Sequence, residues 1–239
     1  MNRFGYEIVP RRSSQIDFPA LLSLLLYKNP KDFFFVQIGA NDGKKNDPIY
    51  DLVIKYNLSG LLVEPLDGAF QSLLKNYNGN SNLIFENVAI SNKEGYQSIY
   101  EIKKEFQDTY EEETKEKATM MASFNKDHVR KYLRRGMKEF FKDKQIDDYI
   151  DEVQVKTISF DTLMQKHRIK NIDLLQIDTE GFDFEIIKMV DFNKYSPKLI
   201  NYESVHLNAS DRAQCESLLK ENGYLLLNNK ADTYAIKKP

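Results

Sequence analysis

Three observations predict an α/β fold with a doubly wound, mostly parallel sheet of seven strands. Short apolar runs alternate with segments of helical periodicity, which is the pattern of parallel strands joined by crossover helices. The first strong run, Phe33–Ile38, ends abruptly in a turn that contains Gly39 and Gly43. The last two runs are separated only by residues 229–231, too few for a crossover, so we expect an antiparallel hairpin there.

Each strand and helix follows from this alternation. The expected strands are Phe33–Ile38, Gly60–Glu64, Leu83–Val88, Ile172–Asp178, Lys198–Glu203, Tyr224–Asn228 and Thr233–Ile236. The expected helices are Phe18–Leu26, Asp47–Tyr56, Asp67–Asn76, Phe160–His167, Phe182–Met189 and Asp211–Glu221. The first helix is apolar enough to face the core, but it is too short for a membrane span, which needs about 20 apolar residues.

An insert interrupts the alternation between about residues 90 and 155. Gly95 predicts a hairpin turn that joins Val88–Ser91 to Gln97–Ile102. The charge-dense segment 103–117 predicts a solvated helix or loop, whereas 120–150 regains helical periodicity. That periodicity rests on Phe124, Val129, Leu133, Met137, Phe140 and Phe141. We therefore expect a charged helical insert over about 103–152, either as a lid over one end of the sheet or as surface decoration.

The composition indicates one domain over residues 1–239. Lys and Arg number 34 against 36 Asp and Glu, a net charge of -2, so we expect no nucleic-acid partner bound through bulk charge. The one cysteine, Cys215, excludes an internal disulfide framework and fits a reducing, cytoplasmic setting. It falls in an expected helix, where packing explains it better than a nucleophilic role. The sequence does not indicate an oligomeric state.

The turn after the first strand is the clearest indication of a ligand. The residues expected to contact that ligand are Gln37, Gly39, Ala40, Asn41, Asp42 and Gly43. The spacing Gly39-x-x-x-Gly43 differs from the G-x-G-x-x-G dinucleotide fingerprint, and no Lys-Ser/Thr pair follows as in a P-loop. Asp42 and Asp47 would repel a pyrophosphate. S-adenosylmethionine carries no phosphate and suits the turn better; an ordinary strand-to-loop turn is the alternative.

The ends of the second and third strands extend this candidate site. Glu64 closes the second strand, where its carboxylate could accept both ribose hydroxyls of a nucleoside; its alternative role is a favourable charge at the next helix N-terminus. Asn87, Val88 and Ala89 close the third strand and could pack on adenine, although a featureless strand end explains them equally well.

Acidic residues close the fourth and fifth strands. Asp178 and Glu180 follow the fourth strand and could orient the donor or act on the acceptor, while helix capping is the alternative. Glu203 and His206 follow the fifth, where a histidine could take a proton from a hydroxyl acceptor. Asp178 and Glu203 could instead share a divalent metal, and His206 could be a surface or capping residue.

Taken together, these residues resemble the FkbM family of S-adenosylmethionine-dependent methyltransferases. The matching pieces are Gln37–Gly43, Val63–Pro65, Asn87–Ala89, Ile177–Gly181, and Glu203 with His206. The resemblance covers roughly 33–91 and 155–206, and it implies the Rossmann-like class I methyltransferase fold. It places the first three pieces at the donor and Asp178, Glu180, Glu203 and His206 at the reacting end. Many methyltransferases of this fold have an acid at the position of Gln37.

We therefore expect an S-adenosylmethionine-dependent O-methyltransferase that acts on a hydroxyl of a sugar, glycan or related natural product. His206 is the expected base, helped by Asp178 or Glu203, whereas His128 and His167 lie in expected helices as structural residues. Two rivals remain. One is a nicotinamide-dependent oxidoreductase on a related sheet, disfavoured by the missing third glycine. The other is a non-catalytic nucleoside-binding module.

Overall fold

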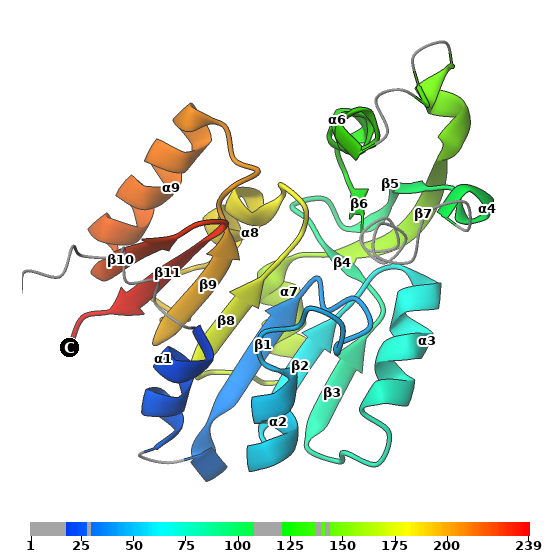
Figure 1. The fold of residues 1–239 in the computed structure, drawn as a ribbon. Helices are drawn as coiled ribbons and strands as arrows, with labels where there is room; N and C mark the ends of the chain where they lie inside the picture. Colours follow the sequence, from blue (N-terminus) through cyan, green and yellow to red (C-terminus); the bar gives the residue numbers. More distant parts are fainter. Residues whose placement is uncertain (1–17, 28–29, 108–120, 137–139, 142–143) are drawn as a thin grey trace, which may run out of the picture.

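A computed structural model describes residues 18–27, 30–107, 121–136, 140–141 and 144–239 (Figure 1). Its larger sheet has the strand order β10-β11-β9-β8-β1-β2-β3. The strands are β1 (Phe34–Ile38), β2 (Ser59–Val63), β3 (Leu83–Glu86), β8 (Leu174–Ile177), β9 (Leu199–Glu203), β10 (Tyr224–Asn229) and β11 (Asp232–Lys237). Only β11 runs antiparallel, paired with β9 on one side and β10 on the other. The seven predicted strands and the C-terminal hairpin are confirmed.

Helices cover both faces of this sheet, because its strands bury side chains on both sides. On one face, Phe35 and Leu62 pack with α1 (Phe18–Leu26), α2 (Tyr50–Tyr56) and α3 (Asp67–Asn76). On the other, Val36 and Leu61 pack with α7 (Phe160–Lys166), α8 (Asp183–Met189) and α9 (Ala209–Glu221). Cys215 is a buried free thiol within α9, which agrees with its predicted packing role. None of the helices among the described residues is long and apolar enough to cross a membrane.

The insert contains a second sheet that the sequence did not predict. Its strands are β4 (Ala89–Ile90), β5 (Gly95–Ile102), β6 (Ala122–Ser123) and β7 (Ile150–Ile158), in the order β4-β7-β5-β6. The predicted hairpin between 88–91 and 97–102 is wrong, because β7 lies between the two strands. It pairs parallel with β4 and antiparallel with the whole of β5, from Gly95↔Thr157 to Ile102↔Ile150. That long ladder supplies hydrogen bonds that a hairpin would otherwise make.

Helical segments complete the insert. They are α4 (Lys104–Gln107), α6 (Lys126–Gly136) and the 3-10 turn η2 (Ile146–Tyr149); a further 3-10 turn, η1 (Pro30–Asp32), precedes β1. As the periodicity predicted, Val129 and Leu133 of α6 are fully buried, and they join a cluster with Phe141. Met137 and residues 108–117 lie outside the described part of the chain. In Figure 1 the insert lies beyond the upper, carboxyl ends of β1, β2 and β8.

Candidate functional site

A pocket of about 930 Å³, partly open to solvent, lies at the carboxyl edge of the larger sheet. This volume counts all the empty space of the pocket, including its solvent-filled mouth. The sheet side of its wall includes Gln37, Gly39, Ala40, Asn41, Glu64, Gln176 and Asp178. The insert supplies Ile99, Ala122, Ser123 and Phe124, and the start of α8 supplies Phe182. The insert is therefore part of the pocket wall rather than a decoration remote from it.

Gln37 presents an unsatisfied acceptor at the bottom of this pocket. Its side chain is 4% exposed, and its Nε2 donates to Asp47 Oδ2 at 2.7 Å. Its Oε1 is shielded from solvent and has no hydrogen-bond partner among the described residues. A buried acceptor without a donor costs free energy, so the geometry fits a bound ligand that donates a hydrogen bond there.

Asp47 is a pocket residue that the sequence analysis did not assign to the ligand. Its Oδ1 accepts the backbone N–H groups of Ile49 and Tyr50, which explains why α2 begins at Tyr50 rather than at the predicted position 47. Its Oδ2 holds Gln37, so the acid that the first strand lacks reaches the pocket from the following loop. Burial raises the pKa of Asp47 to about 6.

The glycines of the first turn serve close packing. A Cβ on Gly39 would fall 1.8 Å from the carbonyl oxygen of Asp178, so this glycine lets the ends of β1 and β8 meet. A Cβ on Gly43 would fall 2.3 Å from Leu73 Cδ1, and Gly43 therefore packs the turn against α3 outside the pocket lining. Both have positive φ, 81° and 66°.

The amides after β1 are already occupied by carboxylates. Asp42 Oδ1 accepts the N–H groups of Lys44 and Lys45 at 2.9 and 2.8 Å, just as Asp47 accepts those at the start of α2. A pyrophosphate would find these donors taken and would meet two negative charges. Asp42 itself borders a neighbouring groove rather than the pocket.

Glu64 closes β2 with both carboxylate oxygens oriented. Its side chain is 5% exposed; Oε2 accepts the N–H of Asn41 and Oε1 that of Leu66, each at 2.9 Å. Each oxygen keeps a second lone pair for a hydroxyl donor. Burial raises the pKa of Glu64 to about 7, against the effect of the two amide hydrogen bonds.

The three residues predicted at the adenine divide into two groups. Val88 and Ala89 line the pocket together with the apolar side chains of Leu66 and Ile99. Asn87 does not line it. Its Nδ2 donates to the carbonyl oxygens of Glu64 and Pro65, at 3.0 and 3.1 Å, and so fixes the end of β2.

At the ends of β8 and β9 the structure brings together the predicted acids and His206. His206 Nε2 lies 3.3 Å from Glu203 Oε2 and 3.4 Å from Glu180 Oε2. Of these three residues, Glu180 is the one that lines the pocket. The interaction with the Glu203 carboxylate raises the pKa of His206 above its usual value, against the opposing effect of desolvation.

Asp178 lies in the cleft, accessible to solvent yet surrounded by other acids. This setting raises its pKa well above the usual range, first by desolvation within the cleft and then by repulsion from Glu203 and Asp183. Asp183 is fully buried and structural: its Oδ2 accepts the hydroxyl of Thr179 at 3.0 Å, and its Oδ1 accepts the N–H of Glu203 at 3.1 Å. The ends of β8 and β9 are thereby tied together.

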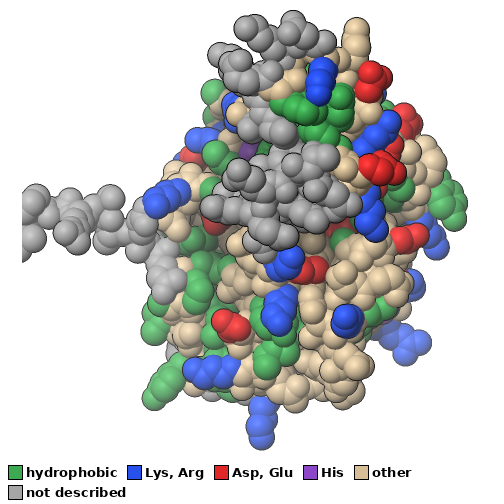
Figure 2. Space-filling model, turned by 45° about the vertical axis from the view of Figure 1, so that its right-hand side comes forward, with side chains coloured by type: hydrophobic (Ala, Val, Ile, Leu, Met, Phe, Trp, Pro, Cys, Tyr) green, Lys and Arg blue, Asp and Glu red, His purple; other side chains and the backbone are tan. Residues whose placement is uncertain are grey.

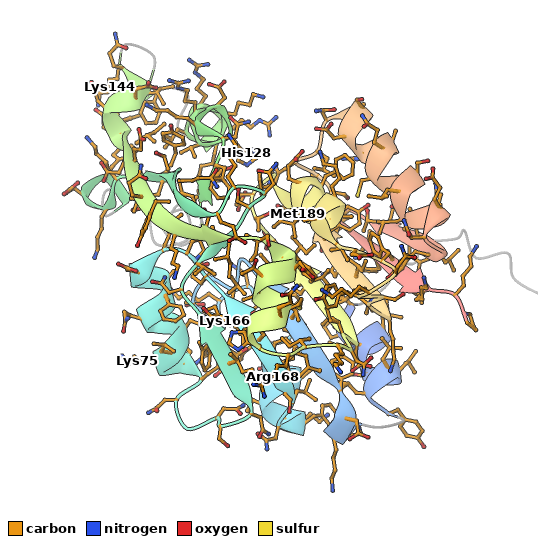
Figure 3. All side chains as sticks on the ribbon, turned by 180° about the vertical axis from the view of Figure 1, so that it is seen from behind. Lys75, His128, Lys144, Lys166, Arg168 and Met189 are labelled. Carbon is orange, nitrogen blue, oxygen red and sulfur yellow. The ribbon has the colours of Figure 1, made fainter. Side chains whose placement is uncertain are left out.

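His128 is a second histidine at the site, and the sequence analysis treated it as structural. It lies in α6 as predicted, but its Nε2 is 3.4 Å from Glu180 Oε2, and its ring is 4.5 Å from that of His206, centroid to centroid. Figure 3 shows it between the insert and α8. No local motif marks this contact, because His128 and Glu180 are 52 residues apart in sequence. The remaining histidine, His167, instead pairs with Glu86 at 2.5 Å.

Comparisons with known proteins identify a family for the chain. The family model described as the methyltransferase FkbM domain matches residues 37–226. No curated protein matches the sequence. Among solved structures, the Methanococcus jannaschii fibrillarin pre-rRNA processing protein is 9% identical, with a TM-score of 0.41 over 87% of this chain and 67% of its own. A precorrin-6y methyltransferase from Geobacter metallireducens is 12% identical, with a TM-score of 0.41 over 97% of this chain and 92% of its own.

Proposed function

The chain belongs to the FkbM methyltransferase domain family, whose methyl donor is S-adenosylmethionine, and we propose a hydroxyl group as its acceptor. In this proposal the hydroxyl belongs to a sugar, a glycan or a related natural product. The observation that carries the proposal is the cluster of His206, Glu203 and Glu180 beside the pocket. A hydroxyl must lose its proton as it attacks a methyl carbon, and a histidine held by carboxylates is suited to accept that proton.

The pocket residues fit the donor in charge and polarity. S-adenosylmethionine supplies a methyl group on a positively charged sulfur, which the acceptor oxygen displaces. We assign Gln37 Oε1 to its ammonium group, because this buried acceptor has no donor among the described residues. Glu64 would accept the ribose hydroxyls, and Val88 with Ala89 would contact the adenine. Asp178, which also lines the pocket, would orient the donor's amino group.

The acceptor side uses the histidine and its carboxylates. In this proposal His206 removes the hydroxyl proton, and Glu203 and Glu180 stabilise the resulting imidazolium. Asp178 orients the two substrates.

The proposal also covers the setting of the enzyme: one methyltransferase domain over residues 1–239, a cytoplasmic location, and a small-molecule or glycan acceptor rather than nucleic acid. The near-neutral net charge of -2 supports the choice of acceptor. Figure 2 shows both basic and acidic side chains on the described part of the face it displays.

The test is methyl transfer from labelled S-adenosylmethionine to a panel of saccharides, with metal chelated. His206→Ala should lower kcat by about 10²- to 10⁴-fold, the usual contribution of a general base, while calorimetry shows nearly unchanged donor affinity. His167→Gln, away from the pocket, is the matched control and should keep normal turnover. Equal turnover of His206→Ala and the parent would remove His206 from the mechanism.

A second variant separates a chemical role from a structural one. Because Glu203 raises the pKa of His206, Glu203→Gln should move the acidic limb of the kcat profile to lower pH while the base remains present. A limb that stays in place would show that another group controls the rate. Donor binding measured on the same variant distinguishes a changed titration from a disturbed pocket.

A further inference from the structure

The insert and the sheet edge together form a cluster with the composition of a transition-metal site. We propose that His128, Glu180 and His206 bind one divalent transition-metal ion of the zinc class, with Glu203 beside them as a fourth ligand. The three first-named ligand atoms lie within 4.8 Å of one another. This site goes beyond the methyl-donor pocket and would bind its ion with or without donor and acceptor.

The distances match ligands arranged around a shared ion. Both histidine Nε2 atoms lie 3.4 Å from the same oxygen, Glu180 Oε2, and His206 Nε2 lies 3.3 Å from Glu203 Oε2. Two ligand atoms held about 2.1 Å from a tetrahedral zinc ion are about 3.4 Å apart. A direct charge-assisted hydrogen bond would be shorter, about 2.7–2.9 Å. The separations therefore suit bonds to a central ion better than bonds to one another.

The ligands are half-buried and come from three different parts of the chain. The exposed fractions of the His128, Glu180 and His206 side chains are 17%, 20% and 23%. Glu180 sits in a fixed turn: its φ is 51°, and its carbonyl oxygen accepts the hydroxyl of Ser123 at 2.9 Å. Glu203 Oε2 is shielded from solvent and has no partner in hydrogen-bonding geometry within the described residues. A metal ion would satisfy this oxygen.

The types of ligand atom indicate which class of metal would bind. Imidazole nitrogens suit zinc, iron, cobalt and related ions, whereas magnesium and calcium prefer sites made of oxygen alone. The carboxylates of Glu180 and Glu203 beside the two imidazoles also favour a cation over a neutral ligand. A half-buried group of carboxylates gains from a divalent ion what it otherwise loses by mutual repulsion.

The catalytic consequence rests on the proposed function. Glu180 also lines the donor pocket, so an ion on Glu180 is adjacent to the reacting groups. A hydroxyl bound to such an ion has a lowered pKa. In the metal-bound enzyme the ion would lower the pKa of the acceptor hydroxyl, whose proton would leave to the solvent that reaches the pocket, and His206 would hold the ion instead of taking the proton. The acceptor hydroxyl would thus be activated at the same position in the site, by the metal ion in place of His206.

Proton NMR of the histidine C2–H signals tests the binding directly, because the chain has only 3 histidines. The 239-residue chain is stripped with chelator and titrated with Co²⁺ in the absence of donor and acceptor. Two of the signals should shift or broaden at one equivalent and the third should persist; Zn²⁺ should displace the Co²⁺, and Mg²⁺ should not. Perturbation of all the signals alike, or of none, would overturn the proposal.

Variants identify the ligands. Glu180→Gln and His128→Gln should each weaken Co²⁺ and Zn²⁺ binding at least about tenfold, which is the cost of disturbing even an outer partner of a metal. His167→Gln should remove the persistent signal and leave affinity unchanged. Thermal unfolding of each metal-free variant verifies that it is folded. Unchanged affinity in Glu180→Gln would refute the assignment, and failure of methyl transfer with intact metal binding would count against the proposed function alone.

Discussion

Gln37 illustrates how much of a binding site depends on contacts between side chains that are separate in sequence. An amide at this position removes the charge that many related folds place at the end of the first strand. Asp47 restores a carboxylate next to it, at 2.7 Å from the amide nitrogen. The amide is thereby oriented with its nitrogen toward Asp47 and its oxygen left without a partner among the described residues. The two residues act as a unit, which neither position reveals alone.

The residues that the sequence did identify are those with strong local constraints. Gly39 stood out because it follows a buried strand directly, where small residues let a ligand approach the backbone; in the structure it lines the pocket, and it also lets the turn approach the Asp178 carbonyl. Glu64 stood out because a carboxylate that ends the second strand is placed where the ribose hydroxyls of a nucleoside would lie. His128 was not, because its environment depends on how the insert folds back over β8.

Glu64 allows a prediction of pH dependence. Since burial raises its pKa to about 7, donor binding should strengthen as pH rises through that value, where the carboxylate becomes able to accept two hydroxyls. Glu64→Gln should weaken donor binding about 10- to 100-fold above this pH, the equivalent of about 1.5–3 kcal/mol for a charged hydrogen bond. Calorimetry across the pH series measures both effects.

The Glu64 carboxylate should also make the free energy of unfolding depend on pH. This dependence has the opposite sign: donor binding strengthens as pH rises, whereas stability falls. A carboxylate whose pKa is raised on folding holds its proton more tightly in the native state, so its contribution to stability falls as pH rises from about 4.5 to about 7. Glu64→Gln should flatten this decline in urea unfolding. Identical pH profiles for the variant and the parent, in both binding and stability, would contradict the buried carboxylate and its role at the ribose.

At the scale of elements, the larger sheet was predictable because its strands are buried on both faces and read as continuous apolar runs. Strand β7 was missed for the opposite reason: its buried and exposed residues alternate, within an insert whose charge suggested solvent exposure. Its partner β5 is distant in sequence: the paired residues run from Ile102↔Ile150 to Gly95↔Thr157. Strands so far apart are not joined by a short turn, so no turn residues in the sequence indicate that they pair. The hairpin predicted at Gly95 was wrong for the same reason, because β7 lies between the two strands that it would have joined.

A further prediction concerns the stability of the start of α2. Asp47 accepts two backbone N–H groups there, so Asp47→Ala should reduce the free energy of unfolding by about 0.5–2 kcal/mol, as for other lost helix caps. Because Gln37 also loses its partner, donor affinity should fall in the same variant. Urea unfolding and calorimetry measure the two losses.

Asp51→Ala is the matched control, since Asp51 is an exposed acid in the first turn of the same helix. It should change stability by no more than about 0.5 kcal/mol, the usual range for surface substitutions. Equal effects of the two substitutions would mean that charge near α2, rather than the cap and its contact with Gln37, determines stability and binding.

At the scale of the molecule, two sheets meet at one functional edge. The larger sheet brings the residues of five loops to its carboxyl ends, as doubly wound sheets do, and this could be anticipated from strand order alone. The insert adds the facing wall, including Phe124, whose ring packs 4.8 Å from that of Phe182, centroid to centroid. The sequence left open whether the insert is a lid or surface decoration, because its position depends on long-range packing rather than on local pattern.

The last prediction concerns which ligand binds at the carboxyl edge of the larger sheet, S-adenosylmethionine or a nicotinamide dinucleotide. A nicotinamide dinucleotide needs free amides for its pyrophosphate after β1, whereas here Asp42 and Asp47 occupy them. S-adenosylmethionine at about 100 times its Kd should therefore stabilise the protein by about 2.7 kcal/mol, raising Tm by about 5–10 °C. NADH at the same concentration should leave Tm unchanged. Stabilisation by NADH but not by the sulfonium donor, in parallel thermal scans of one preparation, would reverse the assignment of this edge and favour the oxidoreductase.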